Sequence, residues 1–223
     1  MNPTAKKVAH FGLLVALSLV LGLMDRALPL SALLGGYIPG VKLGLANTVL
    51  VYAVFLMDWK SCFLLMLAKV VLSGLIFGSL SAILYSLAGG LLSLGVMLLV
   101  RHHPKAGALT AAAVSGFSAV FLFARHPQPA EGLFWCMIII AAVFPASLAL
   151  FLMLRRHPEG KVIAVSLCGA VAHNVGQVAA AALILQTPRL LSTYLPILAG
   201  IGAAVGWLTG IVSHRVLRAL SKR

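Results

Sequence analysis

Acidic residues are scarce in this sequence. The chain of 223 residues contains only 4 Asp and Glu against 17 Lys and Arg, and charged residues make up 9% of it. A soluble domain is roughly 25% charged and about 45–50% apolar. This chain is 61% apolar and has a mean hydropathy of +1.07. The composition therefore excludes an ordinary soluble domain and predicts an integral membrane protein.

The few acidic residues are also isolated, since no two of them lie within five residues of each other. Prenyl-diphosphate chemistry with Mg²⁺ needs clustered carboxylates to hold the metal ions. The sequence contains no P-loop, GxSxG, HExxH or CxxC motif, and its three cysteines are widely spaced. We therefore expect no enzyme activity, no metal site and no cofactor in this chain. The basic residues form no stripe interleaved with aromatics, so we expect no nucleic-acid partner.

Long apolar runs fill the rest of the sequence, bounded by charged residues, Pro or Gly. Eight can be drawn, over 8–24, 41–57, 61–79, 82–100, 107–124, 133–154, 161–185 and 194–213. About 20 apolar residues in a helix cross the roughly 30 Å of hydrocarbon in a bilayer. The runs therefore predict an all-α integral membrane helix bundle of about eight spans. We expect it to form a single polytopic domain over 1–223.

The basic residues predict the orientation of these spans, because Lys and Arg accumulate in cytoplasmic loops. With the N-terminus inside, twelve of the 17 fall on the cytoplasmic side: Lys6, Lys7, Lys60, Arg101, Lys105, Arg155, Arg156, Lys161, Arg215, Arg218, Lys222 and Arg223. Four fall outside: Arg26, Lys42, Arg125 and Arg189. We therefore expect both termini in the cytoplasm of a bacterial-type cell and the chain in its cytoplasmic (inner) membrane, surrounded by lipid.

Several polar residues interrupt the apolar runs at similar depths. Asn47 lies near the outer end of the second run, and His173, Asn174 and Gln177 lie near the middle of the seventh. Polar groups inside a membrane are costly and by default indicate function. The alternative is that the amides form hydrogen bonds between helices. If they have a function, their depths predict a common site in the outer half of the membrane.

Lys69 is the one basic residue in the middle of a run. None of the acidic residues lies inside a run, so the sequence offers its ammonium group no internal counter-ion. Three interpretations stay open. The amine is neutral, the side chain extends along its apolar stem to the cytoplasmic surface, or it faces an anionic ligand.

Four motifs resemble one known family. They are LGLMDRALPL at 21–30, GVKLGLAN at 40–47, YSLAGGLLSL at 85–94 and GAVAHNVGQ at 169–177. In order and spacing they are similar to heptaprenyl diphosphate synthase component I, also called the Gx transporter family. That family resembles the substrate-binding (S) components of energy-coupling factor (ECF) transporters.

The resemblance implies a six-helix core, here 1–103 and 160–223, interrupted by an inserted helical hairpin at about 104–159. It also implies capture of a small molecule near the outer surface. A transmembrane coupling subunit and ABC-type ATPases would drive its release, so that ATP acts only through these partners. Small residues on the first helix would contact the coupling subunit, and the matching residues here are Ala9, Gly12 and Ala16.

Together these observations predict a transporter component that imports a small hydrophobic or anionic metabolite, such as an isoprenoid or quinone-pathway precursor. The expected substrate-binding residues are Arg26, Lys42, Asn47, Lys69, His173, Asn174 and Gln177. Two alternatives belong to other classes. One is a membrane subunit of a flavin or quinone electron-transfer system. The other is a membrane anchor for a prenyl synthase.

Overall fold

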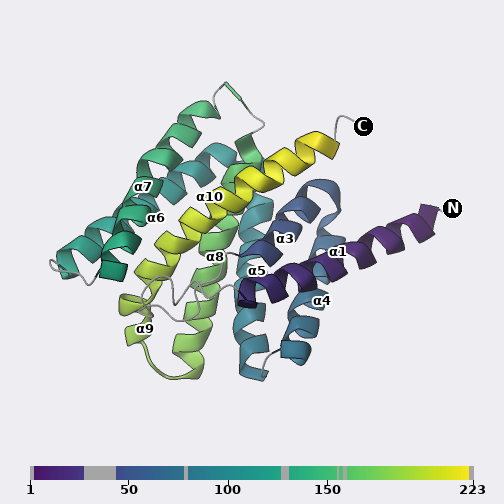
Figure 1. Cartoon of the computed structure of the whole chain (residues 1–223), viewed down its shortest axis with the longest axis horizontal. Coiled ribbons are helices and arrows are strands. Elements are labelled where there is room, and N and C mark those ends of the chain that lie inside the picture. Colours follow the sequence, from purple (N-terminus) through teal and green to yellow (C-terminus); the bar gives the residue numbers. More distant parts are fainter. Residues whose placement is uncertain are drawn as a thin grey trace.

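A computed structural model describes residues 3–27, 44–77, 80–126, 131–154, 156–157 and 160–220. Within these ranges the chain is helical and contains no strands. The helices are α1 (Pro3–Ala27), α3 (Leu45–Leu56), α4 (Trp59–Phe77), α5 (Leu80–His102), α6 (Pro104–Arg125), α7 (Glu131–Met153), α8 (Lys161–Ile184), α9 (Arg189–Thr193) and α10 (Leu195–Leu220). The predicted all-α fold class is confirmed (Figure 1).

Among the described residues, six helices are long and apolar enough to cross a membrane: α1, α4, α5, α6, α8 and α10. Two shorter apolar helical stretches, Leu45–Leu56 and Met137–Met153, correspond to the second and sixth predicted runs. At about 1.5 Å per residue, the 12 residues of α3 extend only about 18 Å. The structure therefore supports a multi-pass membrane protein, and the count of eight crossings stays a prediction.

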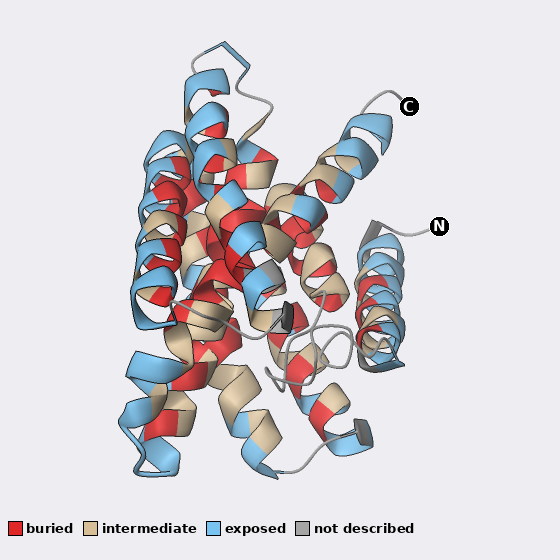
Figure 2. Cartoon of the chain, turned by 60° about the vertical axis from the view of Figure 1, so that its left-hand side comes forward, coloured by how far each residue is buried: buried red, intermediate tan, exposed pale blue. Residues whose placement is uncertain are grey.

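Basic residues from α5 and α8 meet at one end of the bundle, beside the end of α3. The Arg101 guanidinium, at the end of α5, donates a hydrogen bond to the Val54 carbonyl near the end of α3. Arg101 and Lys161, which begins α8, each lie 5.8 Å from the Phe55 ring. We call the end of the bundle that carries Arg101 and Lys161 the basic end. The start of α1 and the end of α10 lie on the same side of the molecule in both views (Figures 1 and 2). Which side of the membrane the basic end faces stays a prediction.

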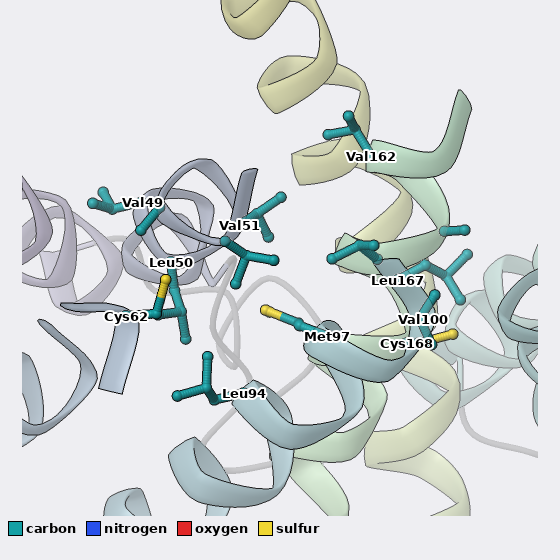
Figure 3. Close-up of a cluster of buried hydrophobic side chains, with 14 of the residues drawn as sticks. Val49, Leu50, Val51, Cys62, Leu94, Met97, Val100, Val162, Leu167 and Cys168 are labelled. Carbon is teal, nitrogen blue, oxygen red and sulfur yellow. The ribbon is translucent and has the colours of Figure 1, made fainter. Parts of the chain in front are cut away.

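Helix α8 occupies the centre of the bundle, where glycines let neighbouring backbones approach it. A Cβ at Gly176 would lie 2.7 Å from the Ala88 carbonyl oxygen of α5, and one at Gly206 of α10 would lie 2.6 Å from the Leu167 Cα. Small residues four apart permit such close packing in membranes. Beside this contact, Met97 of α5 lies between side chains of α3 and Leu167 of α8 (Figure 3).

Helix α1 lies at the edge of the bundle and packs against α3 and α4 (Figures 1 and 2). Its inward face includes Leu14 and Ser18, which are 5% and 1% exposed. The opposite face carries Ala9, Gly12 and Ala16, all of which are exposed. A Cβ at Gly12 would meet nothing within 4 Å. The predicted small-residue face is therefore uncovered in the isolated chain.

Helices α6 and α7 pack against each other as a hairpin, which contacts α8 and α10 (Figure 1). They correspond to the predicted insertion at about 104–159. A small cluster of buried side chains, including Leu122, Met137 and Ile140, joins the hairpin to Ile201 of α10. The division into core and insertion stays a prediction.

Asp58 caps the start of α4 at the basic end. The Ser61 N–H donates to Asp58 Oδ2 at 3.1 Å, and the Ser61 hydroxyl donates to Oδ1 at 2.7 Å. These hydrogen bonds lower the pKa of Asp58 below its usual value of 3.8. A carboxyl with a lowered folded-state pKa stabilises the fold above its unfolded pKa, and this stability is lost as the pH falls through the folded pKa.

We therefore expect the Tm of the wild type to fall slightly more steeply below about pH 4 than that of Asp58→Asn. Asparagine is a comparable N-cap and does not titrate. Thermal unfolding in detergent, measured from pH 7 to pH 3, checks this difference. Parallel curves for the two proteins would show that the carboxylate contributes nothing beyond its role as a cap.

Candidate functional site

A cavity of about 150 Å³ lies among six helices. It is lined by Gly22 and Asp25 of α1, Gly44, Asn47 and Leu50 at the start of α3, Met66, Lys69, Val70, Ser73 and Gly74 of α4, Ala82, Ser86 and Gly90 of α5, Ala170, His173, Asn174 and Gln177 of α8, and Leu198, Ile201, Gly202 and Val205 of α10. These are the six helices of the predicted core, and none of the described lining residues comes from α6 or α7. One water needs only about 10–15 Å³ of such space, so the cavity has room for a small molecule.

The Lys69 ammonium lies in this cavity and donates a hydrogen bond to Asn47 Oδ1 at 2.6 Å. The two residues are 22 positions apart and come from neighbouring helices. A charge-assisted hydrogen bond of this length is short and strong. It fixes the position of the ammonium group in the cavity, so the side chain does not extend to the basic end.

Two residues of α8 reach the cavity because glycines on its neighbours leave space for them. Asn174 Nδ2 donates to the Leu198 carbonyl at 2.6 Å, and a Cβ at Gly202 would lie only 2.5 Å from that nitrogen. A Cβ at Gly89 would lie 2.7 Å from Gln177 Cγ. His173 also lines the cavity, one turn before Gln177. Five of the seven predicted binding residues therefore meet in one cavity: Asn47, Lys69, His173, Asn174 and Gln177.

The other two predicted binding residues are Lys42 and Arg26. Lys42 lies outside the described residues, and so does the side chain of Arg26, whose backbone belongs to α1. Their place in the binding site stays a prediction.

Asp25 is a residue that the sequence interpretation missed. It is only 5% exposed and lines the same cavity as Lys69. The sequence offers Lys69 no acidic residue inside an apolar run, and the structure adds Asp25, from the end of α1, to the wall of the cavity that Lys69 lines. Helix α1 continues to Ala27, so Asp25 belongs to its last turn and faces inward with Leu14 and Ser18. The helical periodicity of the sequence indicates this inward direction of Asp25, since residues 14, 18 and 25 share one helical face.

Ser73 and Ser86 are two further polar residues in the cavity wall. Ser73 follows Lys69 by one turn on α4, and Ser86 lies within the motif at 85–94. Within the described ranges, no protein group hydrogen-bonds to these hydroxyls or to the Gln177 amide. Each can therefore donate to and accept from a bound molecule.

The cavity lies in the half of the bundle away from the basic end. Lys69 comes eight residues before the end of α4, and Gln177 comes seven residues before the end of α8. At about 1.5 Å per residue these positions are roughly 10–12 Å from the helix ends opposite the basic end. These residues therefore share one level along the bundle, and the depth of that level in a membrane stays a prediction.

The cavity wall combines a cation, a carboxyl, amides, hydroxyls and apolar side chains such as Leu50 and Val70. Binding sites for small molecules have this mixture of apolar walls and a few oriented polar groups. In the part of the chain that the structure describes, no three His, Cys, Asp or Glu residues are grouped to hold a metal ion. The arrangement suits binding of a small amphipathic molecule.

The sequence matches one protein family, described as heptaprenyl diphosphate synthase component I, over residues 14–125 and 130–216. The matched region includes both helices of the α6–α7 hairpin. No match was found among curated proteins or among solved structures. The family match covers most of the sequence, in agreement with the resemblance that the four motifs indicate. The chain belongs to the heptaprenyl diphosphate synthase component I family.

Proposed function

We propose that this protein is the substrate-binding component of a membrane transporter that imports a small hydrophobic or anionic metabolite. The observation that carries this proposal is the cavity, in which Lys69, Asn47, His173, Asn174 and Gln177 meet. All six helices of the predicted core contribute to its wall. Hydrogen bonds between helices would not require a cavity of about 150 Å³ between these polar residues.

The position of the cavity is consistent with uptake from outside. Lys and Arg favour the cytoplasmic side of a membrane. That rule places the basic end and both termini in the cytoplasm, and the cavity in the outer half of the cell membrane. A ligand would then enter from the side opposite the basic end. The Lys69 ammonium would bind an acidic or carbonyl group, and the apolar walls would bind a short hydrocarbon portion. An isoprenoid or quinone-pathway precursor has both features.

Release into the cytoplasm would need an energy source, which we assign to partner subunits. The exposed face of α1, with Ala9, Gly12 and Ala16, is suited to close packing against another membrane helix. A transmembrane coupling subunit would bind there, and ABC-type ATPases bound to it would hydrolyse ATP. This chain would then need neither catalytic residues nor a cofactor.

Gly12→Leu should separate partner binding from ligand binding. Gly12 faces open space in the isolated chain, so a leucine there should leave the fold intact and block close approach of a partner helix. We expect a loss of at least about tenfold in co-purifying coupling subunit and ATPases, the effect of roughly 1.4 kcal/mol. The variant should keep the small molecule that native mass spectrometry detects on the wild type from its own host.

Gly95→Leu is the matched control, because Gly95 on α5 also has nothing within 4 Å. It should keep both partners and ligand. Recovery of the wild-type protein alone, without any small molecule or ATPase, would contradict the proposed transport function. Equal loss of partners in both variants would contradict the role of α1.

The family description supports a second candidate function, because it names a component of a prenyl diphosphate synthase. In that case the chain would bind a soluble synthase to the membrane. The four acidic residues of the sequence are too dispersed to hold the metal ions themselves. Co-purification of such a synthase, with activity that requires this chain, would favour this function over transport.

A further inference from the structure

A second hollow lies on the opposite face of α8 from the cavity around Lys69 and shares no lining residue with it. On α5 its lining residues lie nearer the basic end than those of the cavity. It is a groove of about 380 Å³ between α5, α6 and α8. Helices α5 and α6 are separated only by His103, and both pack on α8. They make few contacts with each other, which leaves the groove open between them. Small residues, among them Ala106, Gly107 and Ala111, form its α6 side.

The wall of this groove offers almost no hydrogen-bonding groups. Apart from His103 and Thr110, its lining consists of apolar residues, Gly107 and Cys168. The Thr110 hydroxyl donates to the Ala106 carbonyl at 2.9 Å, and the Cys168 thiol donates to the Gly107 carbonyl at 3.1 Å. A polar molecule would lose its water there without replacement. The groove therefore suits a hydrocarbon chain.

The length of the groove matches one leaflet of a bilayer. On α5 its lining extends from Leu92 to His103. Eleven residues at about 1.5 Å each correspond to roughly 16 Å. The hydrocarbon of a whole bilayer is about 30 Å thick. A chain anchored at the level of His103 would therefore remain in the leaflet on the side of the basic end.

Two basic residues lie where the groove approaches the basic end. His103 lines it, and the exposed Lys105 directly precedes the lining residue Ala106. Lys161, with Arg101 beside it on the Phe55 ring, belongs to the same end of the bundle. The one acidic side chain described at this end is Asp58, which bonds to Ser61. A phosphate at the mouth would therefore be attracted, by an amount worth about fivefold in affinity per lysine at a membrane surface.

We propose that this groove is a binding site for an anionic phospholipid, with one acyl chain between α5, α6 and α8 and the phosphate beside His103 and Lys105. The chain fills an apolar space that no side chain of the described protein occupies. The negative charge of the headgroup neutralises part of the positive charge at the basic end. This site is independent of the cavity around Lys69, so its test is independent of the transport function.

The acyl-chain part of the site is tested by Thr110→Phe, since Thr110 lines the groove and is exposed. Delipidated protein in detergent is titrated with phosphatidylglycerol, and binding of the first lipid is measured by native mass spectrometry. Phenylalanine should weaken it roughly tenfold, which corresponds to about 55 Å² of lost apolar contact. Leu109→Phe is the matched control, because Leu109 is 52% exposed on the same helix and does not line the groove. It should bind as the wild type does.

The headgroup part is tested by Lys105→Gln, which should weaken phosphatidylglycerol binding about fivefold. Lys7→Gln removes a basic residue of α1 far from the groove and should have no effect. Phosphatidylcholine, whose headgroup is zwitterionic, should bind the wild type more weakly than phosphatidylglycerol. The affinity for phosphatidylcholine should not change in Lys105→Gln.

Three results would overturn the proposal. Equal binding of both lipids with no effect of Lys105→Gln would show that the mouth does not select a phosphate anion. Unchanged binding in Thr110→Phe would place the lipid elsewhere. Displacement of phosphatidylglycerol by farnesyl diphosphate at a lower concentration would assign the groove to a prenyl diphosphate instead.

Discussion

Replacing Lys69 with methionine should weaken ligand binding in the cavity roughly 10- to 100-fold and leave the bundle folded. A hydrogen bond with a charged partner contributes about 1.5–3 kcal/mol, and each 1.4 kcal/mol is a factor of ten in affinity. Methionine keeps the apolar stem that packs in α4 and removes only the ammonium, whose present partner is Asn47 Oδ1. The ligand is first identified by its mass on wild-type protein from its own host, and its affinity is then measured by equilibrium dialysis.

Lys60→Met is the matched control, because Lys60 lies on the same helix, is exposed and faces the basic end beside Trp59. Its affinity for the ligand should equal that of the wild type. Asn47→Ala removes the group that positions the ammonium and should give a smaller loss than Lys69→Met. Unchanged affinity in both Lys69→Met and Asn47→Ala would contradict the assignment of this cavity as the ligand site.

The common level of the polar residues along the bundle was predictable from the sequence. Amides, an imidazole and an ammonium are expensive in hydrocarbon, so such side chains seek each other or a polar cavity. Counting residues from the ends of each apolar run gives their depth, and Asn47, Lys69 and Gln177 have compatible depths. Depth alone does not show which side of a helix faces the bundle. For that reason the sequence predicted a common level in the membrane, and the structure was needed to show a common cavity.

Asp25 was missed because it directly follows the apolar run at 8–24. A charged residue at the end of a run is usually a boundary in contact with water. Here α1 continues to Ala27 and packs its last turns against the bundle, so that the carboxyl lies in the cavity wall. Hydropathy locates the apolar length of a helix and contains no information about which neighbour covers its last turn.

Ser73 and Ser86 were missed for a different reason. A serine in a membrane helix commonly bonds to a carbonyl of its own helix and then carries no functional information. Ser18 and Ser115 do so here, bonding to the carbonyls of Val15 and Ala111. The sequence does not distinguish those serines from Ser86, whose hydroxyl faces the cavity.

The start of α3 also differs from the predicted run at 41–57. The helix begins at Leu45, and Gly44 before it has a φ of 65°, in the left-handed region. Residues other than glycine adopt that conformation at a cost. Because residues 41–45 are largely apolar, hydropathy extends the run through them. Asn47, which accepts the hydrogen bond from Lys69, lies three residues after Gly44 in the first turn of this helix.

The second large effect concerns the glycine at the centre of the bundle. Gly176→Ala should lower the free energy of unfolding by about 1–3 kcal/mol, the usual cost of overpacking. The new Cβ would lie 2.7 Å from the Ala88 carbonyl oxygen and 2.9 Å from the Gly89 Cα. Both are backbone atoms, so no side chain can rotate away and α5 must separate from α8. At roughly 2–4 °C per kcal/mol for a chain of this size, the Tm should fall by several degrees.

Gly95→Ala makes the same chemical change on α5, where a Cβ meets nothing within 4 Å. Alanine is favoured over glycine in a helix by about 0.5–1 kcal/mol, so this variant should be slightly more stable than the wild type. Both variants are compared by thermal unfolding in the same detergent, followed by circular dichroism. Opposite signs would show that close contact between α5 and α8 stabilises the bundle. A stabilising effect in both would mean that these two helices do not approach as closely as Gly89 and Gly176 allow.

The same variants also test ligand binding in the cavity, because α5 and α8 supply Ser86, His173, Asn174 and Gln177 to its wall. Separation of the two helices should therefore weaken ligand binding in Gly176→Ala and leave it unchanged in Gly95→Ala.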